Sequence, residues 1–399
     1  MTVYAQAGHG KSDKIIRGLT DGSISGVIWS PKDEFPHSMQ VDTHSYKTEF
    51  PNSIMLFDPQ FYTTVLGGTK DRCLRHYPYW RTLTRSYFND SANIRTSVQE
   101  TLDYQLTLNV DRLLSPSIEI DSFGSADCNI SLLLANESIR YHQELSSTNL
   151  ALPPLSVSLI ISEACLSSPS NFNSFLDDIS IMQSAGFYLI VHRVESQYQA
   201  RFDPNALENL LYLVYVLVEI NSYEVICGYS DFVGTLLCAV GAKAIGTGWF
   251  SNLRQFTMDR FLPSTPKRQA RPRYSSQPLM NSLLLDEMDT INRQGQLQSI
   301  LSGTIYDTVF NTVPNPSDAP WVIDESTLHH WFVLQGLTTL APSGTVQDNL
   351  NICIGMISNA QAIYNNLRRI MSLNVYSGDH HLQQWETAIS NFRNRVNIS

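Results

Sequence analysis

Residues 155–162 read LSVSLIIS, and three further segments of similar kind follow: FYLIVHR at 187–193, VICGYS at 225–230 and KAIGTG at 243–248. These are short runs rich in Val, Ile, Leu and aromatic residues, and a stretch with a helical pattern separates each from the next. Near-continuous apolar strands are typical of parallel sheets that helices cover on both faces. Alternation of such strands with helices predicts an α/β fold.

Three earlier segments continue the pattern toward the N-terminus: GVIWS at 26–30, SIMLFD at 53–58 and SIEID at 117–121. Seven strand–helix units favour a (β/α)8 TIM-type barrel with a C-terminal helical appendage. An open, doubly wound sheet is the alternative. A barrel needs an eighth strand, and we expect it after residue 262, with YSSQPLMNSLLL at 274–285 as the best candidate.

Three regions follow from this pattern. Residues 1–22 are predicted to be a flexible N-terminal arm, residues 23–310 the barrel and residues 321–399 a C-terminal region of three helices. The proline-rich segment 311–320 separates the last two. GHGKS at 8–12 resembles a phosphate loop, but Ala5 stands where that motif needs glycine, and too few residues precede it for the required strand.

Composition limits the class of function. The 399 residues contain 27 Lys+Arg and 37 Asp+Glu, and a formal charge of −10 argues against a general nucleic-acid binder. The six cysteines include no C-x-x-C pair, and the adjacent histidine pairs have poor spacing for a metal on a helix, so no metal site is expected. No cofactor is indicated. The sequence shows neither a secretory signal nor a membrane-spanning run, which predicts a cytoplasmic protein that has no membrane partner.

The candidate catalytic residues follow the predicted strands, because chemistry in such barrels lies at the carboxyl ends of the strands. A carboxylate that ends an apolar strand is costly to bury unless it is paired or used, and a histidine there suits proton transfer near neutral pH. Each candidate also has a structural alternative, such as a helix cap, a turn or a satisfied core histidine. The candidates are Asp58, Asp121, Glu163, His192 and Asp231.

A ligand site is predicted in GTGWFSNLRQF at 246–256. Glycines at a strand end let backbone N–H groups approach an anion, and barrels often hold phosphate after strands seven and eight. Arginines there and downstream would add charge-assisted contacts. The alternative is an ordinary tight turn. The predicted ligand-binding residues are Gly246, Gly248, Asn252, Arg254 and Arg273.

Two contact surfaces are also predicted. The basic loop 260–273 could contact nucleic acid, although the net charge does not favour this, and the C-terminal helices could contact a second copy or a partner protein.

Two functions remain open. The first is a barrel enzyme acting on a phosphorylated or nucleotide-like substrate by hydrolysis, elimination or glycosyl transfer. The second is a catalytically silent barrel subunit of a larger assembly, in nucleic-acid processing or phage defence. An enzyme should bring at least two of the five catalytic candidates within about 8 Å of each other. A silent barrel should have its mouth filled by apolar side chains.

Overall fold

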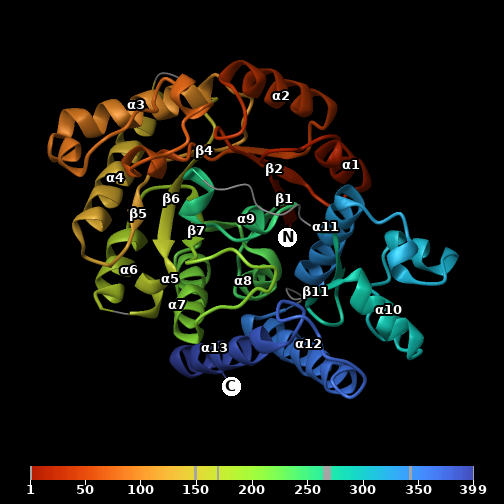
Figure 1. Cartoon of the computed structure of the whole chain (residues 1–399). Coiled ribbons are helices and arrows are strands. Elements are labelled where there is room, and N and C mark those ends of the chain that lie inside the picture. Colours follow the sequence, from red (N-terminus) through yellow and green to blue (C-terminus); the bar gives the residue numbers. More distant parts are fainter. Residues whose placement is uncertain (1, 148–150, 169, 264–270, 341–343, 399) are drawn as a thin grey trace.

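Eight strand positions lie side by side in one parallel sheet that curls into a nearly closed barrel (Figure 1). The computed structural model describes residues 2–147, 151–168, 170–263, 271–340 and 344–398. The strands of the barrel are β1 (Thr2–Gln6), β2 (Gly26–Trp29), β3 (Ile54–Phe57), β4 (Leu113–Leu114), β5 (Glu119–Ile120), β6 (Leu155–Ser162), β7 (Gly186–His192), β8 (Glu224–Gly228) and β9 (Ala244–Thr247).

The order of the strands confirms the predicted barrel. β4 and β5 pair with the beginning and the end of β6, so together they fill one strand position. The two edges of the sheet meet where a parallel bridge joins Leu56 of β3 to Arg112, the residue before β4. An open sheet would leave these edges apart.

The N-terminal segment differs from the sequence prediction. Residues 2–6, which were assigned to a flexible arm, form β1 and pair with both neighbours: Tyr4 lies opposite Gly26 of β2 and Gly246 of β9. The barrel therefore takes its missing strand from the start of the chain. The prediction of the eighth strand at 274–285 was wrong, since β10 (Arg273–Ser276) and β11 (Asn281–Leu284) form a separate antiparallel pair.

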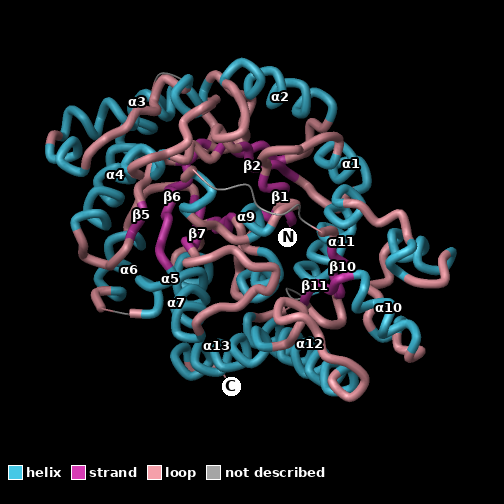
Figure 2. Tube along the Cα trace, in the orientation of Figure 1, coloured by secondary structure: helices cyan, strands magenta, loops and turns pink. Residues whose placement is uncertain are grey.

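Helices surround the strands in an outer ring, while α9 lies near the centre of the view and α10 lies to one side (Figure 2). The helices of the described residues are α1 (Lys14–Asp21), α2 (Pro36–Glu49), α3 (Ser91–Leu106), α4 (Ala126–Ser146), α5 (Glu163–Ser167), α6 (Phe172–Ser180), α7 (Pro204–Tyr215), α8 (Gly234–Ala239), α9 (Ser251–Arg254), α10 (Leu285–Arg293), α11 (Ile323–Leu340), α12 (Val346–Leu367) and α13 (His380–Val396). None of the helices in the described ranges is both long and apolar enough to cross a membrane.

The C-terminal helical region is integrated with the barrel. α11 packs against β1, α1 and α8, so it takes the place of the eighth barrel helix. α12 packs on α8 and α13 on α7, which adds a second layer on one side. Burial of these helices against the barrel brings polar side chains of the C-terminal region to the carboxyl ends of the strands.

Local sequence explains several of these elements. α7 begins where the sequence predicts, because the Asp203 side chain accepts hydrogen bonds from the N–H groups of Asn205 and Ala206, and Pro204 stands at the first helical position. α4 begins similarly, with the Ser125 hydroxyl accepting from Cys128 N–H. In the barrel wall β2 is buried throughout and β6 up to its last residue, Ser162, as expected for strands covered on both faces.

Candidate functional site

Asp58 follows β3 and lies fully buried at the carboxyl end of the barrel. Its carboxyl group accepts hydrogen bonds from Gln60 N–H at 2.9 Å and from the Tyr62 hydroxyl at 3.1 Å. Burial nevertheless raises the pKa of Asp58 to about 6, since the two hydrogen bonds only partly offset the loss of water around the charge. A carboxyl group with this pKa exchanges protons near neutral pH.

Arg260 lies beside Asp58 and is also buried. Its guanidinium donates to the Tyr229 hydroxyl at 2.8 Å and forms an ion pair with Asp33 at 3.3 Å, and Lys32 contacts the same Asp33 at 3.0 Å. Burial opposes the charge of Arg260, but Tyr229 and Asp33 outweigh it and raise its pKa. We call Asp58, Tyr62, Tyr229, Arg260 and Asp33 the axial cluster.

Two further polar side chains reach the same space from inside the barrel. The Tyr188 hydroxyl of β7 lies 3.5 Å from Gln6 Oε1 of β1, and the Gln6 amide nitrogen is buried without a hydrogen-bond partner among the described residues. Their place is fixed by β7 and β1, which are separated in the sheet by β8 and β9. Gln6 is not among the residues predicted from sequence, because it lies in the segment 1–22 that was expected to be a flexible arm.

Aromatic rings cover the axial cluster. Phe256 and Phe261, from the chain after β9, lie with their ring centres 5.2 and 5.8 Å from that of Tyr62, and Phe256 lies 5.1 Å from Tyr229. Phe256 and Phe261 are themselves buried. The mouth of the barrel is thus filled by aromatic side chains directly above a group that can exchange protons.

Three of the predicted catalytic residues have protein partners on the rim. Asp121 accepts from the hydroxyl of Ser125, the residue that caps α4, at 2.9 Å. Glu163 forms an ion pair with Arg193 at 2.8 Å, and His192 pairs with Glu119. Within the described ranges, no hydrogen bond or ion pair joins any two of the five predicted catalytic residues.

The glycines of the predicted ligand turn pack closely. A Cβ on Gly246 would lie 2.7 Å from the Ile28 side chain, and one on Gly248 would lie 2.6 Å from Leu253. The Gly248 N–H donates to Leu253 O at 3.0 Å, so that amide is already occupied. Asn252 is half-buried in α9. Close packing and an occupied Gly248 amide therefore account for the glycines of this turn.

Four buried arginines lie at this end of the barrel, and they fall into two kinds. Arg193 pairs with Glu163 and Arg260 pairs with Asp33. Arg254 donates its Nε–H to Gly248 O at 3.0 Å, and Arg273 donates to Ser282 O at 2.8 Å and Ser377 Oγ at 2.5 Å. Among the described residues, no carboxylate oxygen lies within 4.0 Å of either Arg254 or Arg273.

Arg254 and Arg273 come from different segments and lie close enough to repel each other. Burial lowers the pKa of Arg273, and Glu287, which accepts a hydrogen bond from the same Ser377 hydroxyl that Arg273 contacts, opposes the shift. The charge of Arg254 makes a smaller contribution that lowers this pKa. Burial also lowers the pKa of Arg254, with Asp231 opposing the shift. The Tyr198 ring lies 5.2 Å from the Arg273 guanidinium. We call Arg254, Arg273 and Tyr198 the unpaired-arginine site.

Asp231 lies beside this site in a strained conformation. Its φ angle is +39°, a region that few side chains adopt, and it is 1% exposed. His330 Nε2 of α11 lies 3.2 Å from Asp231 Oδ1, and His330 Nδ1 lies 2.8 Å from the Ser275 hydroxyl of β10. Burial, together with Arg254, lowers the pKa of His330 to about 4, so His330 is neutral at neutral pH. No sequence signal identified His330, because α11 and β8 meet only in the fold.

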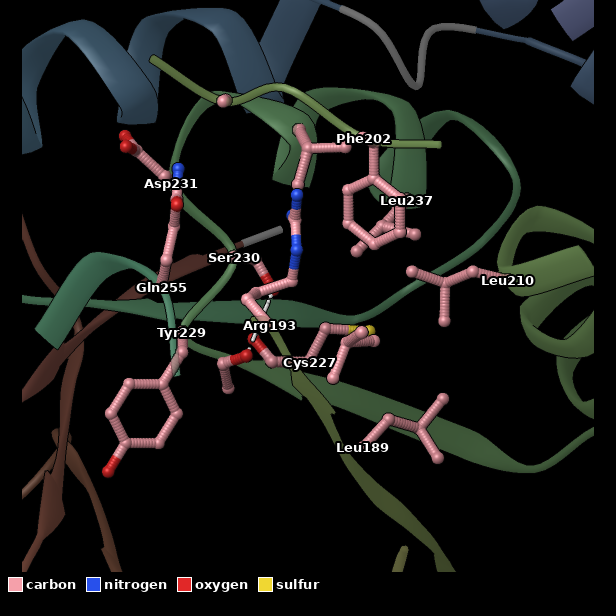
Figure 3. Close-up of a pocket in the computed structure, with 14 residues that line it drawn as sticks. Leu189, Arg193, Phe202, Leu210, Cys227, Tyr229, Ser230, Asp231, Leu237 and Gln255 are labelled. Atoms are coloured by element: carbon pink, nitrogen blue, oxygen red, sulfur yellow. Dashed lines mark hydrogen bonds between the residues drawn. The ribbon is translucent and has the colours of Figure 1, made fainter. Parts of the chain in front are cut away.

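A small cavity adjoins Asp231 between β7, β8, α7 and α8 (Figure 3). Its far end is apolar, with Leu189, Leu210 and Leu237. Asp231 and Gln255 lie at the opposite end, and Arg193 stacks on Phe202 between them with its guanidinium 3.9 Å from the ring centre. The polar end of this cavity therefore lies toward the unpaired-arginine site.

The predicted basic loop is divided between burial and solvent. Arg260 and Arg273 are buried, whereas the Arg271 side chain is exposed and lies 3.6 Å from Asp286. Lys267 and Arg268 lie outside the described residues. The two arginines at the ends of the loop are thus buried, with side chains that contact Asp33 and Ser377 respectively.

Comparison with known proteins identifies no family for this chain. No protein-family model matches the chain, and no curated protein matches it.

Proposed function

We propose that the chain is a barrel enzyme that acts on a phosphorylated or nucleotide-like substrate at the carboxyl ends of its strands. The observation that carries the proposal is the unpaired-arginine site after β9. Two buried guanidinium groups without an ion-pair partner are costly, and a bound anion would remove that cost. Planar guanidinium groups match the oxygens of a phosphate particularly well.

The axial cluster supplies the proton-transfer group of the proposed enzyme. Asp58 is the proton-transfer group, because its pKa of about 6 lets it both give and accept a proton near neutral pH. The Tyr62 hydroxyl orients its carboxyl group. Hydrolysis, elimination and glycosyl transfer all need such a group, so the reaction type remains open within this proposal.

In this proposal three other predicted catalytic residues hold neighbouring groups of the rim in place. Glu163 holds Arg193, Asp121 contacts the cap of α4, and His192 pairs with Glu119. These contacts fix the rim between β5 and β7. In this proposal Asp231 acts beside the arginines rather than in proton transfer at Asp58.

Native mass spectrometry with a panel of nucleotides and sugar phosphates tests the proposal. We expect at least one phosphorylated compound to bind and Arg254→Met to abolish that binding. Arg140→Met is the control, because Arg140 is exposed and pairs with Glu137 on α4. Asp58→Asn should keep the binding and lose turnover of the bound compound. Failure of every compound to bind the folded protein would overturn the proposal, as would binding that Arg254→Met leaves intact.

A catalytically silent barrel is the second candidate, and the aromatic cover favours it. Tyr62, Tyr229, Phe256 and Phe261 fill the mouth above Asp58. The C-terminal helices would then serve as a contact surface for a second copy or a partner protein. In the same experiment this function predicts that no small compound binds and that the protein appears as an oligomer or with a co-purified partner.

A further inference from the structure

The loop at residues 199–202, between β7 and α7, is joined to α13 by hydrogen bonds between residues far apart in the chain. Trp385 Nε1 of α13 donates to Ala200 O at 3.1 Å, and Phe202 N–H donates to Gln384 Oε1 at 3.2 Å. Ala200 and Phe202 also line the small cavity (Figure 3). The attachment of this loop to α13 therefore fixes one wall of the cavity.

His381, in the first turn of α13, is fully buried at this contact. Its Nε2 lies 3.1 Å from Met280 O, and a carbonyl oxygen can only accept, so Nε2 carries a proton. Its Nδ1 lies 3.3 Å from Gln199 Nε2, and an amide nitrogen can only donate, so Nδ1 is the acceptor. These two hydrogen bonds require a neutral imidazole.

Two other contacts fix the orientation of the Gln199 amide. Its nitrogen also donates to Gly378 O at 2.5 Å, and its oxygen accepts from Arg201 Nε. Turning the amide over would break both contacts. Because Gln199 and His381 are both buried, a proton added to His381 Nδ1 would face an N–H group and find no acceptor there.

The charged groups around His381 do not remove this cost. Burial has the largest effect and lowers the pKa of His381 to about 4. Asp379, which pairs with Arg368 of α12, and Asp231 favour the charged form of His381, whereas Arg201 opposes it. Among the described residues, no carboxylate oxygen lies within 4.0 Å of a His381 ring nitrogen.

We propose that the contact between His381 and Gln199 is an acid-sensitive latch, which holds residues 199–202 against α13 and releases them when His381 takes up a proton from solvent. The proton binds Nδ1, the atom that faces Gln199. Release moves one wall of the small cavity and frees the neighbouring Tyr198, whose ring lies 5.2 Å from the Arg273 guanidinium. The latch does not depend on the proposed enzymatic activity.

Amide hydrogen exchange of the intact chain at about pH 7.5 and about pH 4.5, corrected for the intrinsic exchange rate at each pH, tests the inference. The released imidazole binds a proton at its ordinary pKa of 6.5 and the latched one only near 4, so release becomes more favourable as pH falls through this window. We expect the amides of residues 199–202 and of the first turn of α13 to lose at least about tenfold more protection than those of β6 and β7.

His381→Gln separates this residue from the other groups that titrate in the same range. The glutamine amide can still donate to Met280 O, but it takes up no proton, so the extra loss of protection at residues 199–202 should disappear. His380→Gln is the matched control, because the neighbouring His380 is exposed, and this variant should behave as the unmodified protein does.

Two results would overturn the inference. In the first, residues 199–202 lose protection together with β6 and β7 in the unmodified protein, as in acid unfolding of the whole chain. In the second, His381→Gln keeps the extra loss of protection. The first comparison needs no variant, so it decides the matter even if His381→Gln fails to fold.

Discussion

The axial cluster and the unpaired-arginine site hold buried charges in opposite ways. On the barrel axis, Arg260 has Asp33 and the Tyr229 hydroxyl as partners, and Asp58 has Gln60 and Tyr62. After β9, Arg254 and Arg273 donate only to carbonyl and hydroxyl oxygens. The charged groups on the axis thus have partners within the protein, although the neighbouring Gln6 Nε2 and Arg260 Nε have none among the described residues. This difference is the ground on which we propose that a ligand brings negative charge to the second site.

The largest expected change in the free energy of unfolding comes from replacing Arg260 of the axial cluster. Replacing Arg254 of the unpaired-arginine site gives the comparison. Arg260→Met should destabilise the protein by about 3–5 kcal/mol, because it removes the donor to the Tyr229 hydroxyl and leaves the mostly buried Asp33 with only the more exposed Lys32 as a partner. Arg254→Met should cost only about 1–2 kcal/mol, the value of its hydrogen bond to Gly248 O. Urea unfolding of both variants gives the two free energies. Equal losses would remove the distinction between the two regions.

The pH dependence of stability tests Asp58 next. Its pKa rises from the ordinary 3.8 to about 6 on folding, so the folded state holds a proton that the unfolded chain has released between these values. Stability therefore falls as pH rises through that window, by about 3 kcal/mol from this group. Asp58→Asn should be more stable than the original chain above pH 6 by a similar amount and should lose that part of the pH dependence. Parallel pH profiles for the two proteins would contradict the assignment.

The dependence of stability on phosphate concentration tests the unpaired-arginine site. If the unpaired-arginine site binds phosphate, the free energy of unfolding should rise by about 2.7 kcal/mol at a phosphate concentration about 100 times the Kd. The rise should disappear in Arg254→Met. A rise that survives this substitution would locate anion binding elsewhere on the molecule. Thermal unfolding at several phosphate concentrations measures the effect.

The smallest expected effect concerns Tyr62. Tyr62→Phe removes a hydrogen bond that lowers the pKa of Asp58, so that pKa should rise further and stability should fall by about 1 kcal/mol. Tyr79→Phe is the matched control, because the buried Tyr79 hydroxyl donates to Pro59 O rather than to Asp58. Its loss should be similar in free energy, while the pH profile of stability keeps its midpoint.

Seven of the eight strand positions could be predicted because each is a local apolar run with a helix after it. The eighth could not, since TVYAQ at 2–6 is short and half polar. It becomes a strand because the edges of β9 and β2 offer hydrogen-bonding partners on both sides. The candidate at 274–285 has more apolar residues, but it satisfies its backbone as a separate hairpin.

At the candidate site, too, the features that depend on neighbouring residues could be predicted, and those that depend on residues far apart in the chain could not. Their position directly after a predicted strand was sufficient to identify Asp58 and Asp231 as candidate catalytic residues. Their partners could not be inferred, because residues far apart in sequence supply them: 227 positions separate Arg260 from Asp33, and 73 separate His192 from Glu119. A pairing between distant residues leaves no periodic signal in a single sequence.

The sequence by itself determined the class of fold, the direction of the strands and the end of the barrel where ionisable residues gather, because hydrophobic runs and helix caps act over a few neighbouring residues. Only the tertiary structure decided which buried charged side chains have a partner of opposite charge. Arg193 and Arg260 found carboxylate partners, whereas no carboxylate oxygen of the described residues lies within 4.0 Å of Arg254 or Arg273. His330 reached Asp231 from a helix that the sequence placed outside the barrel. The energy of a buried charge depends on what surrounds it in space, and chain folding alone sets that environment.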